Sequence, residues 1–485
     1  MQKRKAAKMV CVQIERIAEA MGYPSDLRVT PVGKEGLSHL LYLNSLVDDE
    51  TVAWATDQFA AFTAVRTAGL ELPVRGRLRP LDGSSAAVEV LLEGNLVVVN
   101  GEMLAVEAQG WLKREPQEPE TERVIRGPRE GFTETLADNI GLVRRWIRDP
   151  SLQVEELRVG RRTKTRVVLV YLADVAPPRM VSEVRRRLEA LDLDGILESG
   201  YIQQLITDRR ASIFPLIQAT ERSDRIAAGI LEGRVAILVD KSTTSLLVPV
   251  TINELYQTPE DYYLSFWVGS FLRLIRLLGN NLAVALPGLY IAVTDFHPEL
   301  LPTQLALAIA GTRTRVPVPL LAELFIMEIA VEVFREAGLR LPGSVGQTLG
   351  MVAGSVLGLT AVQAGFVSPA TLVVVAVTAI ASFTGPNYEV GVTWRLLKFM
   401  LAIAAALFGL HGLTIAGILV LVHAADLKSF GVSYLAPWAP LQWEELGDAP
   451  VRKPFWARWH RPETYRPRNK LRTGGTKRED DEDDA

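Results

Sequence analysis

The pattern of apolar and polar residues divides the chain into two parts. Residues 1–275 mix charged and apolar positions, whereas residues 277–425 are strongly apolar. From Gly343 to Gly385 there is no charged residue. A bilayer core needs about 20 apolar residues per helix, and lipid offers no partner for an unpaired backbone group. The pattern therefore predicts a soluble region followed by an all-α multi-span transmembrane domain.

Within the soluble region, alternating apolar positions predict two related α/β subdomains. Each has a buried strand followed by a helix and, further on, strands joined in a hairpin. Asn100-Gly101 is a strong hairpin signal in the first. Leu92-Glu93-Gly94 recurs as Leu231-Glu232-Gly233, although chance resemblance between hairpins is the alternative. The stretches are 38–62 (strand, helix) and 86–108 (strands), then 166–191 (strand, helix) and 230–250 (hairpin).

A helix is predicted between the subdomains, after a linker rich in Pro and Glu. Thr133 or Thr135 would cap it. Its apolar face would hold Leu136, Ile140, Val143 and Ile147. Four arginines nearby would form either a phosphate or lipid patch, or else a solvated face or ion pairs between subdomains; these are Arg126, Arg129, Arg144 and Arg145.

Six apolar stretches are predicted to cross the membrane: 277–296, 318–334, 343–366, 369–388, 393–410 and 412–427. With the soluble region inside, six spans place most loop and tail cations inside, as the positive-inside bias requires. Arg313 and Arg315 break that bias. Four or five full spans with re-entrant pieces are therefore the alternative.

These patterns set the predicted domain boundaries. We expect a leader at 1–32, α/β subdomain 1 at 33–112, a linker and connecting helix at 113–154, α/β subdomain 2 at 155–258, the membrane domain at 259–430 and a cytoplasmic tail at 431–485. The tail is rich in Pro, Trp and Arg and ends in acidic residues, which is typical of a surface-hugging segment followed by disorder.

Composition narrows the chemistry. Cys11 is the only cysteine, which excludes a disulfide within the chain and a cysteine zinc site and favours a cytoplasmic soluble region. The leader lacks the apolar run of a signal peptide. The common phosphate-loop, nucleophile-elbow, zinc-protease and dinucleotide motifs do not occur. We therefore expect that the protein is not an enzyme, that it uses no cofactor or metal, and that it has no nucleic-acid partner.

Two features of the apolar region suggest function. Gly346, Gly350, Gly354 and Gly358 recur every four residues, so they share one helix face. That face suits close helix packing, either in an ordinary helix pair or at a subunit interface. Carboxylates also occur within apolar sequence, at Glu323, Glu328 and Glu332. They would face a bundle interior or water path, or lie at the membrane surface.

Several stretches together resemble the A subunit of GerA-family spore germinant receptors. They are VIRGPREGFTETLADNIGLVRR (124–145), ESGYIQQLITDRRASIFPLIQATERSD (198–224), ILEGRVAILVD (230–240), PGLYIAVTDFHPELLPTQL (287–305), RVPVPLLAELFIMEIAVEVFREAGLRLPGSVG (315–346) and SFGVSYLAPWAP (429–440). Ser223 and Ser433 stand where the family pattern has proline. The related sporulation-stage paralogue of the A subunit is therefore an alternative.

The resemblance implies a multi-pass protein of the inner spore membrane, working with a transporter-like B subunit and a lipoprotein C subunit. It also implies a homo-oligomer, proposed to be pentameric, that forms a nutrient-gated channel for monovalent cations. A non-conducting signalling scaffold is the second hypothesis. A secondary transporter is a weaker third, because residues 277–427 show no inverted repeat.

A channel would need a pore lining and a cation path. Opposite the glycine face lies a second stripe, with polar hydroxyl groups at its start and apolar side chains toward its end. Such a stripe could line a pore, with the apolar side chains as its gate. The alternative is that the stripe faces lipid. The pore and gate candidates are Thr348, Val352, Ser355, Leu359, Val362 and Phe366. The cation-path candidates are Glu323, Glu328 and Glu332.

Overall fold

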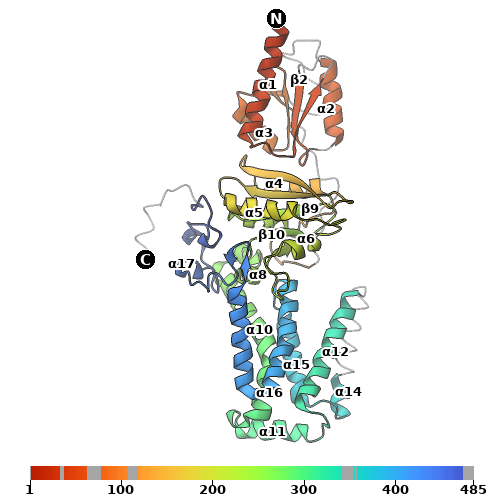
Figure 1. Cartoon of the computed structure of the whole chain (residues 1–485), viewed down its shortest axis with the longest axis vertical. Coiled ribbons are helices and arrows are strands. Elements are labelled where there is room, and N and C mark those ends of the chain that lie inside the picture. The colour runs from red at the N-terminus through yellow and green to blue at the C-terminus, as the bar shows by residue number, and fades with distance from the viewer. Residues whose placement is uncertain are drawn as a thin grey trace.

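In the computed structural model the chain is an elongated molecule with two α/β layers above a helical region (Figure 1). The structure describes residues 2–32, 38–47, 49–62, 78–106, 118–119, 121–340, 354 and 358–472. The C-terminal segment, containing α17 (Trp443–Leu446), returns to lie beside the second layer (Figure 1). The predicted fold class, two α/β subdomains followed by a helical region, is confirmed.

The first layer is a five-stranded antiparallel sheet with helices on both faces. Its strand order is β1-β2-β4-β5-β3. The elements in chain order are α1 (Gln2–Ala20), β1 (Leu27–Val32), β2 (Ser38–Leu43), α2 (Asp49–Phe62), β3 (Leu78–Pro80), α3 (Ser84–Leu92), β4 (Leu96–Val99) and β5 (Met103–Val106).

The second layer repeats this design. Its antiparallel strand order, β6-β7-β9-β10-β8, is position for position that of the first sheet. The elements are α4 (Leu136–Trp146), β6 (Leu152–Val159), β7 (Thr165–Leu172), α5 (Pro178–Glu189), α6 (Ser199–Ile206), β8 (Gln218–Thr220), α7 (Ser223–Leu231), β9 (Val235–Val239) and β10 (Ser245–Val248). Apart from the added α6, helices and strands alternate in the same order in both.

Packing within the repeats is also alike. Helices α1 and α3 share one core with the first sheet, as α4 and α7 do with the second. Helix α2 covers the other face of the first sheet, and α5 with α6 covers that of the second. The matching Leu-Glu-Gly triplets end α3 and α7, where Gly94 and Gly233 take positive φ angles of 83° and 93°. Glycine takes such angles without strain, which explains why both helices end alike.

Several assignments differ from the sequence-based expectation. Residues 86–92, expected in a strand, belong to α3, because a short apolar run fits either period and here the run begins after Gly83 and packs on the sheet as a helix. Residues 1–32, expected as a leader, contain α1 and β1. Val10 and Ile17 of α1 are buried in the first core, and β1 pairs with β2, so this segment is part of the first repeat.

The helix predicted after the linker is α4, and Thr135 precedes its first residue. Its predicted apolar face is buried, with Leu136, Ile140, Val143 and Ile147 all in the second core. The helix was expected to connect the subdomains. It is instead the first helix of the second repeat, in the position that α1 has in the first.

The helical region follows two short helices, α8 (Ile252–Tyr256) and α9 (Glu260–Tyr263). Its longer members are α10 (Phe266–Ile291), α11 (Thr303–Arg313), α12 (Leu320–Arg340), α14 (Gly358–Gln363), α15 (Pro369–Ser382) and α16 (Tyr388–Asp426). Helix α10 continues as a π-helical turn at Ala292–Phe296. Figure 1 shows α11 lying across the end of the region that is far from the sheets.

Helix α16 is a hairpin of two helices. Gly409 has φ 61° and ψ −142°, which breaks the helix. Both ends of α16 return to the second repeat, since Gln203 donates to Glu389 at 2.8 Å and Arg209 donates to Asp426 at 2.9 Å. The Phe214 ring contacts Trp394 of one arm and His423 of the other, with ring centroids 5.7 and 6.1 Å apart. The turn predicted at 410–412 therefore lies at Gly409.

Two described helical segments have the length and apolar composition of a membrane span, Phe266–Phe296 and Tyr388–Asp426, and Pro369–Ser382 is a shorter apolar helix. At 1.5 Å per residue the two arms of α16 measure about 30 and 25 Å, close to the thickness of a bilayer core. Because α16 breaks at Gly409, it consists of two apolar helices, each about as long as a bilayer core is thick.

Candidate functional site

A cluster of charged side chains joins three helices of the apolar region. Glu328 and Glu332 lie one turn apart on α12 and face α16. The ammonium group of Lys398 is 2.5 Å from Glu328 and 3.2 Å from Glu332. Arg395 lies 3.0 Å from Glu332, and Arg335 lies 3.3 Å from it. Arg335 also donates to Ser382 of α15 at 2.8 Å, so the cluster links α12, α15 and α16.

Burial makes this cluster costly to break. The side chains of Glu328 and Lys398 are 1% and 4% exposed, so removing either would leave the other charge without water. The side chain of Glu332 is 25% exposed and is the most accessible of the three predicted carboxylates. Arg335 lies within one turn of Glu332 on the same helix, whereas Lys398 and Arg395 come from α16 and were not foreseen as partners.

Glu323 serves a different contact. It is fully buried and accepts a hydrogen bond of 2.6 Å from the backbone nitrogen of Ser368. Ser368 in turn caps α15 through its hydroxyl, which accepts from Thr371. Arg313, which breaks the positive-inside bias, lies 2.8 Å from Asp295 and 3.9 Å from Glu323. Its charge is thus compensated at the end of the helical region far from the sheets.

The predicted glycine and pore stripes are described only in part. Gly346, Thr348, Gly350, Val352 and Ser355 lie outside the described residues. Gly358 is buried against Leu372, and Gly354 has no neighbouring side chain among the described residues. Leu359 and Phe366 are 62% and 66% exposed, and Val362 is half-buried. The described residues leave Leu359 and Phe366, at this end of the stripe, uncovered.

A second cluster lies where the sheets meet the helices. Asp261 accepts from Arg276 and lies 3.3 Å from Arg273, which fastens α9 to the first turns of α10. Arg273 also donates to the backbone oxygen of Asp448 at 2.7 Å. Asp448 belongs to the C-terminal segment, so three parts of the chain meet here. We call this cluster the junction.

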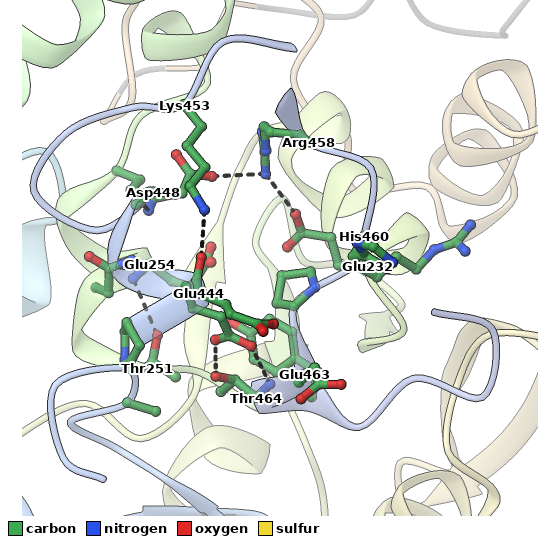
Figure 2. A pocket seen from close by; sticks show the side chains of 18 of the residues that line it. Glu232, Thr251, Glu254, Glu444, Asp448, Lys453, Arg458, His460, Glu463 and Thr464 are labelled. Carbon is green, nitrogen blue, oxygen red and sulfur yellow. Dashed lines mark hydrogen bonds and ion pairs between the residues drawn. The ribbon is translucent and has the colours of Figure 1, made fainter. Parts of the chain in front are cut away.

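The C-terminal segment closes the junction from outside. Arg458 lies 2.9 Å from Asp448 and 3.5 Å from Glu232, the residue that ends α7 (Figure 2). Arg472 also pairs with Glu232. Tyr262 donates to Gln257 at 2.8 Å, and burial raises the pKa of its hydroxyl, which stays a donor at neutral pH. The second repeat, α10 and the tail are therefore held by one network.

Figure 2 shows the cavity that the tail encloses against α8 and against Glu232 at the end of α7. Its volume is about 640 Å³. Acidic side chains that line it have partners within the protein: Lys470 lies 2.7 Å from Glu463, and Thr464 donates a hydrogen bond to Glu445. Among the described residues no group of three or more His, Cys, Asp or Glu side chains is arranged to hold a metal ion.

The four arginines predicted around α4 do not form one patch. Arg144 is buried and makes two hydrogen bonds to Asp26 of the first repeat, at 2.6 and 2.7 Å. Arg129 lies 3.0 Å from Glu118 and Arg145 lies 3.8 Å from Glu130, both at the surface, and Arg126 is exposed. The second of the two interpretations, a solvated face with an ion pair between subdomains, describes them.

A duplicated α/β region joined through a charged junction to a bundle of apolar helices is the organisation expected of a protein with a membrane-associated part. A family model described as Bacillus/Clostridium GerA spore germination protein matches residues 15–464. The chain belongs to this family of spore germination proteins.

Individual relatives support the same family membership. Spore germination protein KA of Bacillus subtilis (strain 168) is 38% identical over 479 residues, covering 96% of this chain and 88% of that protein. Spore germination protein B1 of the same organism is 41% identical over 76% of each chain. Spore germination protein GerLA of Bacillus cereus is 39% identical over 78% of this chain and 77% of that protein.

Among solved structures, the N-terminal domain of the A subunit of the Bacillus megaterium spore germinant receptor GerK3 matches 48% of this chain and 92% of its own, with 28% identity and a TM-score of 0.34.

Proposed function

We propose that this chain is the A subunit of a spore nutrient germinant receptor and that it conducts monovalent cations as a homo-oligomer in the inner spore membrane. The soluble repeats would lie in the cytoplasm, and a transporter-like B subunit and a lipoprotein C subunit would be its partners. The family supports the role in germination. The proposed pentamer, the nutrient gate and the cation path go beyond what the family match supplies.

One observation supports the proposed homo-oligomer. Residues 358–366 are fixed to the bundle on one side, since Gly358 is buried and a Cβ atom added there would touch Leu372, yet Leu359 and Phe366 project from it exposed. Gly354, just before them, is also open among the described residues. A glycine in a helix costs about 1 kcal/mol relative to alanine and is usual where another helix packs closely. A second copy of the chain would supply that helix.

The contacts of the junction support the proposal that nutrient binding gates the channel. Nutrient binding by a partner could open a pore only through a mechanical connection. The network from Glu232 through Arg458 and Asp448 to Arg273 makes that connection between the second repeat and α10. A rotation of the repeats would therefore act directly on the first helix of the apolar region.

The test is nutrient-dependent ion flux. The chain would be reconstituted in liposomes with its B and C subunits, and potassium release would be followed after nutrient is added. We expect release only when all three subunits and nutrient are present, and a particle mass that corresponds to several copies of this chain. Nutrient binding without any flux would overturn the channel.

The non-conducting scaffold remains the second candidate because one observation favours it. Glu323, Glu328 and Glu332 all have partners within the chain, so a single copy has no uncompensated carboxylate among them to attract cations. In that case the same liposomes would bind nutrient, and the junction would change its protease sensitivity, while ion gradients would persist.

A further inference from the structure

Four large aromatic side chains are exposed side by side at the start of α10. Trp267 and Phe271 belong to α10, and Phe455 and Trp456 belong to the C-terminal segment; they are 74%, 62%, 58% and 67% exposed. The Phe266 ring connects the two segments, with its centroid 4.7 Å from that of Trp267 and 5.7 Å from that of Trp456. We call these four residues the aromatic patch. An exposed apolar patch of this kind marks an interaction surface.

The patch continues a longer apolar stripe along α10. Exposed side chains follow one another at spacings of three or four residues, with a last step of seven, which places them on one helix face. They are Trp267, Phe271, Leu274, Leu278, Leu282 and Leu289. From Trp267 to Leu289 this face measures about 33 Å, close to the thickness of a hydrocarbon core. The aromatic patch therefore lies at the end of the stripe, where a bilayer would meet water.

The tail residues of the patch are held in place. Arg452 donates through its backbone nitrogen to Ser270 at 3.0 Å. Its guanidinium donates to the backbone oxygens of Asp261 and Leu264 at 3.0 and 2.8 Å, and it lies 4.6 Å from the centre of the Phe455 ring. The segment is fastened to α10 through polar contacts underneath, while its aromatic rings point outward.

Charges near the patch do not oppose an apolar partner. Arg273 and Arg452 are buried in the junction and directed at Asp261, Asp448 and backbone oxygens. Tryptophan and phenylalanine beside such groups suit the boundary between headgroups and acyl chains, where an aromatic ring can remain partly in contact with water.

We propose that residues 451–457 of the C-terminal segment are a membrane-interface anchor, which together with Trp267 and Phe271 inserts aromatic rings among the phospholipid headgroups. The anchor sets the depth of α10 and holds the tail against the junction from the membrane side. The partner is the lipid interface of the leaflet that faces the soluble repeats. This inference rests on the membrane location in the proposed function.

Depth-dependent quenching tests the anchor in the full chain. Cys11→Ser removes the only cysteine, and Trp456→Cys, Phe455→Cys, Leu278→Cys or Lys470→Cys then carries a fluorophore in liposomes. Nitroxides are placed on the lipid headgroup or deep in the acyl chain. We expect at least a twofold larger loss of fluorescence from the headgroup probe than from the deep probe at 455 and 456. The reverse order is expected at 278, and little quenching at 470.

The outcomes separate the inference from its premise. Quenching at Leu278→Cys with none at 455 or 456 would overturn the anchor and leave the membrane location standing. Spin labels at 456 that broaden one another would assign the patch to a second copy and also overturn it. No quenching at 455, 456 or 278 would remove the membrane location itself.

Discussion

Two hydrogen bonds of 2.6 and 2.7 Å join the guanidinium of Arg144 to the carboxylate of Asp26 across the boundary between the two α/β repeats. The two residues are 118 positions apart, and their side chains are 1% and 6% exposed. Because each charge is withdrawn from water, the contact is stable only while both side chains stay buried against each other. The pair therefore fixes how the repeats sit against each other.

Replacing Arg144 with alanine should lower the free energy of unfolding of the α/β region by about 3–5 kcal/mol, because Asp26 would remain buried without its counter-charge. Denaturant titration of the purified chain measures this loss. Arg145→Ala is the matched control: its side chain is exposed and 3.8 Å from Glu130, and it should lose less than about 1 kcal/mol. Equal losses in the two variants would contradict the role of the pair.

Adding a methyl group at Gly412 should open the α16 hairpin. A Cβ atom there would overlap the backbone oxygen of Ala404 on the facing arm, whereas at Gly417 it would meet no atom of the described residues. We expect Gly412→Ala to lose about 3 kcal/mol or more and to lower the melting temperature in detergent. Gly417→Ala should be neutral or gain up to about 1 kcal/mol. Similar melting of both variants would argue against the hairpin.

Glu332 is the carboxylate to test for a cation path, because it keeps a quarter of its side-chain surface exposed. Glu332→Gln should reduce nutrient-dependent cation flux several-fold without changing the particle mass, since Lys398, Arg395 and Arg335 would lose a shared counter-charge and would repel cations. Glu328→Gln is the comparison: that side chain is buried against Lys398, so its loss should appear as lower thermal stability. Unchanged flux in both variants would assign the acids to structural ion pairs alone.

The uncovered end of the predicted pore stripe makes a further prediction. Val362→Ala and Leu359→Ala should let ions leak without nutrient, because smaller apolar rings no longer close a pore by dewetting. Gly354→Leu should instead reduce the particle mass to that of single copies, because it pushes packed helices apart. Leak is measured in liposomes that contain the full receptor. Wild-type behaviour of both alanine variants, with labelling of these positions by a lipid-soluble probe, would place the stripe in lipid.

Glu183 on α5 predicts a pH dependence in the second repeat. Hydrogen bonds from Arg186 and Arg187 lower its pKa from the ordinary 4.5 to about 2. A carboxylate with a lower pKa in the folded state stabilises that state above its unfolded pKa, and this stabilisation is lost as the pH falls from about 4.5 toward 2. Because the site is partly exposed, Glu183→Gln should lose less than about 1 kcal/mol at pH 7.

Denaturation of the wild type and Glu183→Gln across this pH range measures the difference. It should shrink steadily below about pH 4.5 and vanish near pH 2. A difference that stays constant with pH would show that the substitution acts through packing rather than through charge.

Local patterns in the sequence determined most of the elements. The Asn100-Gly101 turn lies between β4 and β5, the apolar face predicted for residues 136–147 is buried, and the chain reverses at Gly409, next to the predicted turn. These features depend on neighbouring residues only, through periodicity and turn chemistry. The two Leu-Glu-Gly triplets likewise revealed the duplication, because a helix end that needs a positive φ leaves a glycine in the sequence.

Only the tertiary structure showed which repeat each of those elements belongs to. Helices α1 and α4 were expected as a leader and a connector because the helices that pack beside them, α3 and α7, lie far along the chain, and only the folded sheets show α1 and α4 to be equivalent. The partner of Glu328 is Lys398, 70 residues away, and the partner of Arg273 is Asp448, 175 residues away. Ion pairs of this kind leave no periodic trace in the sequence, since they depend on where separate helices cross and on which charges are buried together there.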